Sequence, residues 1–233
     1  MTDGSTHTES HTTLSVSQES ASRRHPANTR EVILDTAEGL FAENGVAATS
    51  IRDITRAAGV NLGAINYHFG TKQDLVAAVF TRRLEPVSKR QLALMENVLR
   101  EAGDRPPSLE AVLEAMIRPT VEKSFAAGKR DLAFTRLVYR SISEPNSEVR
   151  RLIRAQMQET IAFSLKSLAL ACPSLPMGEL VWRMMFTMGA LHSMLQKVAQ
   201  DDLLPPEMRK DLNAETMIRR LVTFAAAGMR AEI

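Results

Sequence analysis

Polar and aromatic side chains gather in a short segment of the N-terminal half, where they could bind a nucleic acid backbone. Tyr67 and His68 can donate hydrogen bonds to phosphate oxygens, and Lys72 adds a positive charge at the start of an expected helix. A second group of phosphate donors stands at the start of an earlier expected helix: Thr49, Ser50 and Arg52. Such contacts position a protein on DNA without specifying a sequence.

The residues between these two groups could contact base edges. The best candidates in this stretch are Asn61, Leu62, Gly63 and Ala64. Small side chains allow close approach, and Leu62 can touch a thymine methyl group. Asn66 is a further candidate, since a side-chain amide can form a bidentate pair with adenine. The alternative for Asn66 is a solvated or backbone-capping amide.

A helix, a tight turn and a second helix would position these side chains. Gly59 supplies the positive φ that a sharp turn needs, and Asn61 can cap a helix expected over residues 62–68. Ile65 and Phe69 are four residues apart and face the core, which leaves the other side of this helix for the major groove. The alternative is an ordinary helical hairpin with small residues at a packing seam.

The rest of the chain has helical periodicity and no convincing strand alternation. The sequence therefore predicts an all-α fold with about nine helices. The expected helices cover residues 28–44, 51–58, 62–68, 71–100 with Pro86 inside, 108–127, 130–142, 146–171, 178–200 and 213–230. The expected parts are a disordered Ser/Thr-rich tail (1–27), a DNA-binding domain (28–73), a connecting helix and loop (74–106) and a C-terminal domain (107–233).

Composition narrows the class of protein. A hydrophobic content of 44% is enough to bury a core, and the single cysteine, Cys172, excludes a disulfide framework within the chain. The chain has neither an apolar run of ~20 residues nor a secretory leader, so we expect a cytoplasmic protein without a membrane span. We find no catalytic triad, phosphate loop or metal-ligand cluster outside the tail, and expect no enzyme activity, metal or cofactor. Metal binding by the tail histidines is disfavoured, and Arg23 and Arg24 could form a DNA-binding arm.

Residues 30–76 resemble the DNA-binding domain of the TetR family of bacterial regulators. The matching residues are Ile33, Leu34, Asp35, Thr36, Ala37, Leu40, Phe41, Gly45, Thr49, Ser50, Ile51, Arg52, Asp53, Ile54, Ala57, Ala58, Gly59, Val60, Gly63, Ile65, His68, Phe69, Lys72 and Leu75. The resemblance implies a helix-turn-helix domain that binds double-stranded operator DNA. It also implies a C-terminal domain that forms a homodimer and binds a small effector. Asn66 stands where the family often has a tyrosine.

A narrower resemblance is to the fatty-acid-responsive branch typified by the regulator PsrA. It rests on residues 59–62, 66–70, 78–80, Arg82, Leu84, Pro86, Trp182, Arg183, 188–190, Phe224 and 226–231. This resemblance implies a repressor that leaves its operator when it binds a long-chain fatty acid or acyl-CoA. The alternative is a repressor of efflux or catabolic genes that responds to another hydrophobic molecule.

The C-terminal half has a Met- and Phe-rich interior that suits an irregular apolar ligand. The candidate lining residues are Met116, Phe134, Phe163, Met185 and Met188. Arg140, Arg183 and His192 are candidate anchors for a carboxylate. The alternative for the apolar residues is plain core packing.

Two apolar stripes at the end of the chain suit a four-helix interface between two subunits. The candidate interface residues are Val181, Met184, Leu191, Leu195, Leu221, Phe224, Ala225 and Gly228. The alternative is that these stripes form the core of a helical bundle within one chain.

Overall fold

A computed structural model of the 233-residue chain describes residues 26–126, 133–135, 137–138, 141, 148–199, 205, 207 and 212–232. The described residues form helices and no strands, as the sequence predicts. The expected tail up to residue 25, its two arginines and most of the helix expected over 130–142 lie outside the described residues. None of the described helices is both long and apolar enough to cross a membrane.

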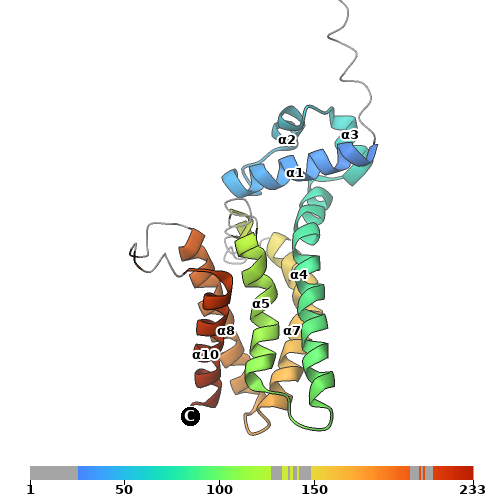
Figure 1. The fold of residues 1–233 in the computed structure, drawn as a ribbon. Coiled ribbons are helices and arrows are strands. Elements are labelled where there is room, and N and C mark those ends of the chain that lie inside the picture. Colours follow the sequence, from blue (N-terminus) through green and yellow to red (C-terminus); the bar gives the residue numbers. More distant parts are fainter. Residues whose placement is uncertain are drawn as a thin grey trace, which may run out of the picture.

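One longer helix and two short ones form one end of the molecule (Figure 1): α1 (Pro26–Asn44), α2 (Ile51–Ala58) and α3 (Leu62–Phe69). α1 begins with a proline, which is favoured at the first position of a helix because its missing N–H needs no partner there. The three helices bury their apolar faces against one another and against the start of α4. Side chains such as Ile33, Phe41 and Ile54 are fully buried in this core.

The remaining helices run side by side as a bundle below these three (Figure 1): α4 (Lys72–Ala102), α5 (Leu109–Ala126), α7 (Glu148–Ala171), α8 (Met177–Ala199) and α10 (Ala214–Arg230). Their core is aliphatic and Met-rich, and includes Met95, Met116, Leu168 and Leu191. Arg118 of α5 forms ion pairs with Glu114 and Glu122 of its own helix and with Glu215 of α10. This cluster fixes α5 against α10 at the bundle surface.

α4 is the helix common to both ends of the molecule. It runs through Pro86 as one helix, although a proline cannot donate the backbone hydrogen bond that would reach the carbonyl of Arg82. The core beneath α1 and the first half of α4 extends to Phe134, Val138 and Ile153 of the body. The three-helix end and the bundle are therefore packed together through a shared core.

Candidate DNA interface and effector pocket

The turn between α2 and α3 has the geometry expected from its sequence. Gly59 adopts the left-handed conformation (φ 64°, ψ 37°), and the N–H of Val60 donates to the carbonyl of Thr55 at 3.1 Å. At the start of α2, the Ser50 hydroxyl accepts from the N–H of Asp53, whose carboxylate accepts from the N–H of Ser50. The hydrogen bonds that the Ser50 hydroxyl and the Ser50 N–H donate to this carboxylate lower the pKa of Asp53, so the cap stays ionised at neutral pH.

Caps fix both ends of α3, a side-chain cap at its start and a glycine at its end. The side-chain oxygen of Asn61 accepts from the N–H of Ala64 at 2.9 Å, so this amide stabilises the helix start, and its NH₂ group stays on the exposed side. The helix ends at Gly70, where φ is positive. Thr71 and Asp74 then form a capping box that starts α4.

α3 has one buried face and one exposed face. Ile65 and Phe69 are buried against the core, whereas Leu62 is 55% exposed and Tyr67 is 81% exposed. Other predicted base-contact residues lie on the outer side or at its edge: Asn61, Gly63, Ala64 and Asn66. A helix with a rigid buried side and an outer side of small, amide and aromatic groups can lie in a major groove.

Some of the residues predicted to contact phosphates are exposed to solvent, and others are half-buried. Ser50, Arg52 and Tyr67 are exposed, and His68 is half-buried, with the Tyr67 ring packed against it edge-on at 5.0 Å between centroids. Lys72 is half-buried, and its Nζ donates to the carbonyl of Val46 at 2.8 Å. The ammonium thus fastens the start of α4 to the α1–α2 loop, and its remaining protons are available to a phosphate.

Thr49 is a correction to the sequence prediction. Its side chain is buried, and its hydroxyl donates to the carbonyl of Gly45 at 2.8 Å. A hydroxyl committed to the turn after α1 cannot reach DNA. Ser50, and not Thr49, is the residue that caps α2.

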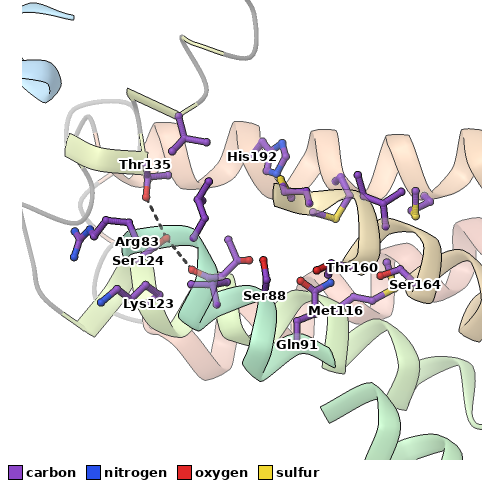
Figure 2. Close-up of a pocket in the computed structure, with 18 of the residues that line it drawn as sticks. Arg83, Ser88, Gln91, Met116, Lys123, Ser124, Thr135, Thr160, Ser164 and His192 are labelled. Atoms are coloured by element: carbon purple, nitrogen blue, oxygen red, sulfur yellow. Dashed lines mark hydrogen bonds between the residues drawn. The ribbon is translucent and has the colours of Figure 1, made fainter. Parts of the chain in front are cut away.

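A cavity of about 470 Å³ opens within the bundle among α4, α5, α7 and α8 (Figure 2). This volume falls within the range of small-molecule sites in proteins. Four of the predicted lining residues lie on its wall: Met116, Phe134, Met185 and Met188. Phe163 does not line it, and packs instead against the core of the bundle.

Neither of the two predicted carboxylate anchors within the described residues, Arg183 and His192, places a positive charge in this cavity. Arg140 lies outside the described residues. Arg183 turns toward the end of α10, where its Nη1 donates to the carbonyls of Gly228, Met229 and Ala231 at 2.9 Å each. His192 does line the cavity, but burial lowers its pKa to about 4, so it is neutral at physiological pH.

Sequence reasoning missed the cations that do line the cavity, Arg83 and Lys123. Hydroxyl and amide groups also line it: Ser88, Gln91, Thr120, Ser124, Thr135, Thr160 and Ser164. A signal was present in α4, because Arg83, Val87 and Gln91 are spaced by four residues and so share one helix face. Among the described lining residues, two are cationic and none is acidic.

Most of the predicted dimer residues point into the chain's own core and not outward. Met184, Leu191, Leu195, Leu221 and Ala225 are buried in the chain's own core, which was the alternative explanation of these stripes. Val181 is half-buried, and only Phe224 and Gly228 are exposed. The exposed apolar residues on α8 that the sequence analysis missed are Trp182 and Phe186, whose rings stack at 6.1 Å.

Comparisons with known proteins agree with this geometry in two separate regions. A family model described as "Bacterial regulatory proteins, tetR family" matches residues 33–79, and one described as "Tetracyclin repressor-like, C-terminal domain" matches residues 114–228. The first covers the helix-turn-helix and the second covers most of the bundle. Together they match more than half of the chain.

Individual relatives match only part of the chain. An HTH-type transcriptional repressor of Mycobacterium tuberculosis is 53% identical over 60 residues, which are 24% of this chain and 32% of that protein. The HTH-type transcriptional repressor KstR2 of Rhodococcus jostii is 30% identical over 133 residues, which are 53% of this chain and 60% of that protein. The chain thus spans about a third to three-fifths of the length of these two relatives.

A solved structure shares the fold over nearly its whole length. The fatty acid degradation regulator FadR from Bacillus halodurans superposes with a TM-score of 0.64 at 18% identity, over 90% of this chain and all of that one. An identity this low shows the fold alone. Both family models match in order along a chain whose described residues form helices and no strands, and this protein belongs to the TetR family of bacterial regulators.

Proposed function

We propose that this protein is a transcriptional repressor that binds operator DNA as a homodimer and leaves the DNA when a hydrophobic small molecule binds. The observation that carries the proposal is the exposed face of α3, where Leu62, Asn66 and Tyr67 stand opposite a fully packed face. The membership of the TetR family supports the same function.

In this proposal α3 lies in the major groove and reads bases with its first turn. The groups around it hold the phosphate backbone: Arg52 and Tyr67 through their side chains, and the capped N-termini of α2 and α4 through backbone amides. Asn61 is fastened to the helix start, so its free NH₂ group is the part that reaches a base. Among the described residues, the side chain of Asn66 makes no hydrogen bond to the backbone, so its whole amide group can turn toward a base.

Two subunits associate through α8 and α10 in this proposal. Trp182, Phe186 and Phe224 are each more than half exposed on these helices, and Gly228 leaves room for close approach. An apolar patch of this kind on a soluble chain marks an interface. Two copies related by a two-fold axis would present two α3 helices to a palindromic site.

The effector in this proposal is a long-chain fatty acid or its coenzyme A ester, bound in the cavity of Figure 2. Met116, Met157 and Met188 provide adaptable apolar walls, and each buried methylene contributes ~0.8 kcal/mol. The cations Arg83 and Lys123 suit an acidic group. The fatty acid regulator FadR shares the fold, which is consistent with this effector class.

A second effector class is favoured by the polar part of the lining. Ser88, Gln91 and Thr160 can hydrogen-bond a ligand that has polar substituents along its length, which an acyl chain does not have. SmeT, a repressor of a multidrug efflux pump with the same fold (TM-score 0.59, 22% identity), has been solved with triclosan. A phenolic or otherwise aromatic effector is therefore the alternative.

The docking arrangement is tested with variants of the exposed face. Fluorescence anisotropy with DNA from upstream of the gene should show that Tyr67→Ala and Arg52→Ala weaken binding to all sequences and reduce its salt dependence. Asn66→Ala should narrow the difference between operator and scrambled DNA. Lys89→Ala, an exposed site on α4, is the matched control and should bind as wild type does. Wild-type affinity and salt dependence in both the Tyr67 and Arg52 variants would show that α3 does not dock as proposed.

The effector class is tested by displacement. Saturated and unsaturated acids of increasing length, free and as coenzyme A esters, are titrated into the protein on its operator, with triclosan as the aromatic comparison. Potency that rises with chain length supports the acyl effector. Displacement by triclosan alone supports the aromatic alternative, and the DNA-binding assignment stands in either case.

A further inference from the structure

Arg83 lies between the cavity and the DNA-binding end of the molecule. It lines the cavity in Figure 2, and its guanidinium carbon lies 5.1 Å from the centre of the Phe134 ring, which also lines the cavity. Its Nε lies 3.5 Å from Oε1 of Glu38, a residue of α1. One side chain therefore contacts both the ligand space and the helix that supports α2 and α3.

Glu38 depends on positive charge from α4. Its side chain is only 2% exposed, and Oε2 accepts from Nη2 of Arg82 at 2.8 Å while Oε1 faces Arg83. A carboxylate this deeply buried is costly unless cations and hydrogen bonds compensate for its lost hydration. Withdrawal of Arg83 would remove one of the two cations of α4 that face Glu38, and the other, Arg82, also pairs with Glu31 and Asp35.

The charges in the cavity favour an acid at this same end. Arg83 and Lys123 both line the cavity, together with Ser124 and Thr135 (Figure 2). Lys123 is exposed, which places it at the opening of the cavity. No acidic side chain is among the described residues of the lining, so a ligand carboxylate would meet only cations on the wall itself, and Glu38 behind Arg83 is the carboxylate with which it would compete.

We propose that Arg83 is the residue through which the DNA-binding domain responds to an acidic effector. The carboxylate of the effector binds Arg83 and Lys123 and so competes with Glu38 for the Arg83 guanidinium. This inference rests on the proposed function and adds the orientation of the ligand: acid group toward α1, apolar tail toward Met116 and Met188.

A ligand releases the protein from DNA only if it binds the released conformation more tightly than the DNA-bound one. Competition for Arg83 gives the effector this preference, because the effector gains its ion pair only where the contact between Arg83 and Glu38 is broken. When Arg83 turns to the ligand, α1 loses a contact with α4 and the spacing of the two α3 helices in the dimer changes. Pro86 lies just after Arg83, and the hydrogen bond it cannot donate leaves α4 easier to bend at this point. The shared core of Phe80 and Phe134, with ring centroids 5.5 Å apart, carries the movement to the DNA-binding end.

The test uses two probes that share a tail and differ in headgroup: dodecanoate and dodecanol, both below the concentration at which they aggregate. Binding to the free full-length protein is measured by calorimetry, and release of operator DNA is measured by anisotropy. For wild type we expect both probes to bind, and dodecanoate at saturation to lower operator affinity at least tenfold more than dodecanol does.

The variants separate the role of the charge from a structural role. Arg83→Gln should weaken dodecanoate at least tenfold, leave dodecanol binding within twofold and abolish the difference between the probes in DNA release. Arg83→Lys, which keeps the charge, should retain most of the dodecanoate affinity even if the Gln variant folds poorly. Lys89→Gln, an exposed cation on the same helix, is the control and should match wild type throughout.

Three results would overturn the inference, and they are distinguishable. If the acid and the alcohol release DNA equally at saturation, the carboxylate has no role in release, although the proposal of an acyl effector is unaffected. Wild-type dodecanoate affinity in Arg83→Gln removes this residue from the site. Binding of neither probe to wild-type protein that still binds operator rejects the acyl effector itself, and the inference with it.

Discussion

At the scale of single residues, the hydrogen bonds of a hydroxyl side chain decide whether it can contact DNA or only stabilises the fold. Thr49 and Ser50 are adjacent hydroxyl residues at the start of α2, yet Thr49 bonds inward to Gly45 and Ser50 caps the helix from the exposed side. The two readings of Thr49 make different predictions. A phosphate contact affects DNA affinity, whereas a buried hydrogen bond affects the free energy of unfolding.

Thr49→Val should lower the free energy of unfolding by about 1 kcal/mol, because it leaves the carbonyl of Gly45 without its side-chain donor. Urea unfolding measures this change. Thr49→Ser keeps the hydroxyl and is the control. The operator affinity of folded Thr49→Val should equal that of wild type, and a clear loss of affinity without a loss of stability would restore the phosphate contact.

His192 should make the protein sensitive to mild acid. Its pKa in the folded protein is about 4, below the ordinary 6.5, because burial opposes its charge. The unfolded chain therefore takes up a proton first as the pH falls, so stability is lost between about pH 6.5 and pH 4 and changes little above that window. The loss from this group is at most about 3 kcal/mol. His192→Gln should flatten the profile of unfolding free energy between pH 7 and pH 4.5, and parallel profiles for variant and wild type would show that His192 titrates normally.

At the scale of elements, the turn between α2 and α3 depends on a backbone conformation more than on contacts. A Cβ added at Gly59 would meet no atom within 4 Å, but its φ of 64° is unfavourable for any other residue except asparagine or aspartate. Gly59→Ala should therefore cost about 1 kcal/mol of stability through backbone strain alone.

Gly39→Ala in α1 is the matched comparison. That site has equal space but ordinary helical geometry, so alanine should stabilise the protein by up to about 1 kcal/mol. Thermal unfolding of the two variants measures both changes. Equal shifts in the same direction would contradict the assignment of strain to Gly59.

These elements also mark how far the sequence could predict the structure. The helix-turn-helix was predictable because its signals are local: Gly59 for the turn, Asn61 for the cap, and the spacing of Ile65 and Phe69 for the buried face. The faces of α8 were not, since apolar residues lie on both sides of that helix and periodicity cannot say which side meets the core. The role of Arg83 was missed because its partner Glu38 is distant in the sequence. The packing of α1 on α4 brings the two side chains together.

At the scale of the whole molecule, substitutions on exposed and on buried positions of α8 and α10 separate effects on dimer formation from effects on folding. Phe186 is 66% exposed in the single chain, whereas Leu221 is buried in its core. Phe186→Glu should give a folded monomer, because the charge falls on the proposed interface and leaves the core intact. Leu221→Glu should unfold the chain, because an unpaired charge enters an apolar core.

Sedimentation velocity and circular dichroism separate these outcomes. Lys166→Glu, an exposed change on α7, is the control and should leave a folded dimer. A Phe186→Glu protein that sediments as a wild-type dimer would place the interface elsewhere. So would a wild-type protein that is monomeric at micromolar concentration.

The proposed function depends on sequence-specific DNA binding by two α3 helices held in one dimer. The most direct measurement is the ratio of wild-type affinities for a palindromic site, selected from random DNA or found upstream of the gene, and for a scrambled duplex of the same length at the same salt. We predict a ratio of about 10³ or more at physiological ionic strength. Equal affinity for the two duplexes, or failure of selection to yield any two-fold symmetric site, would contradict the account.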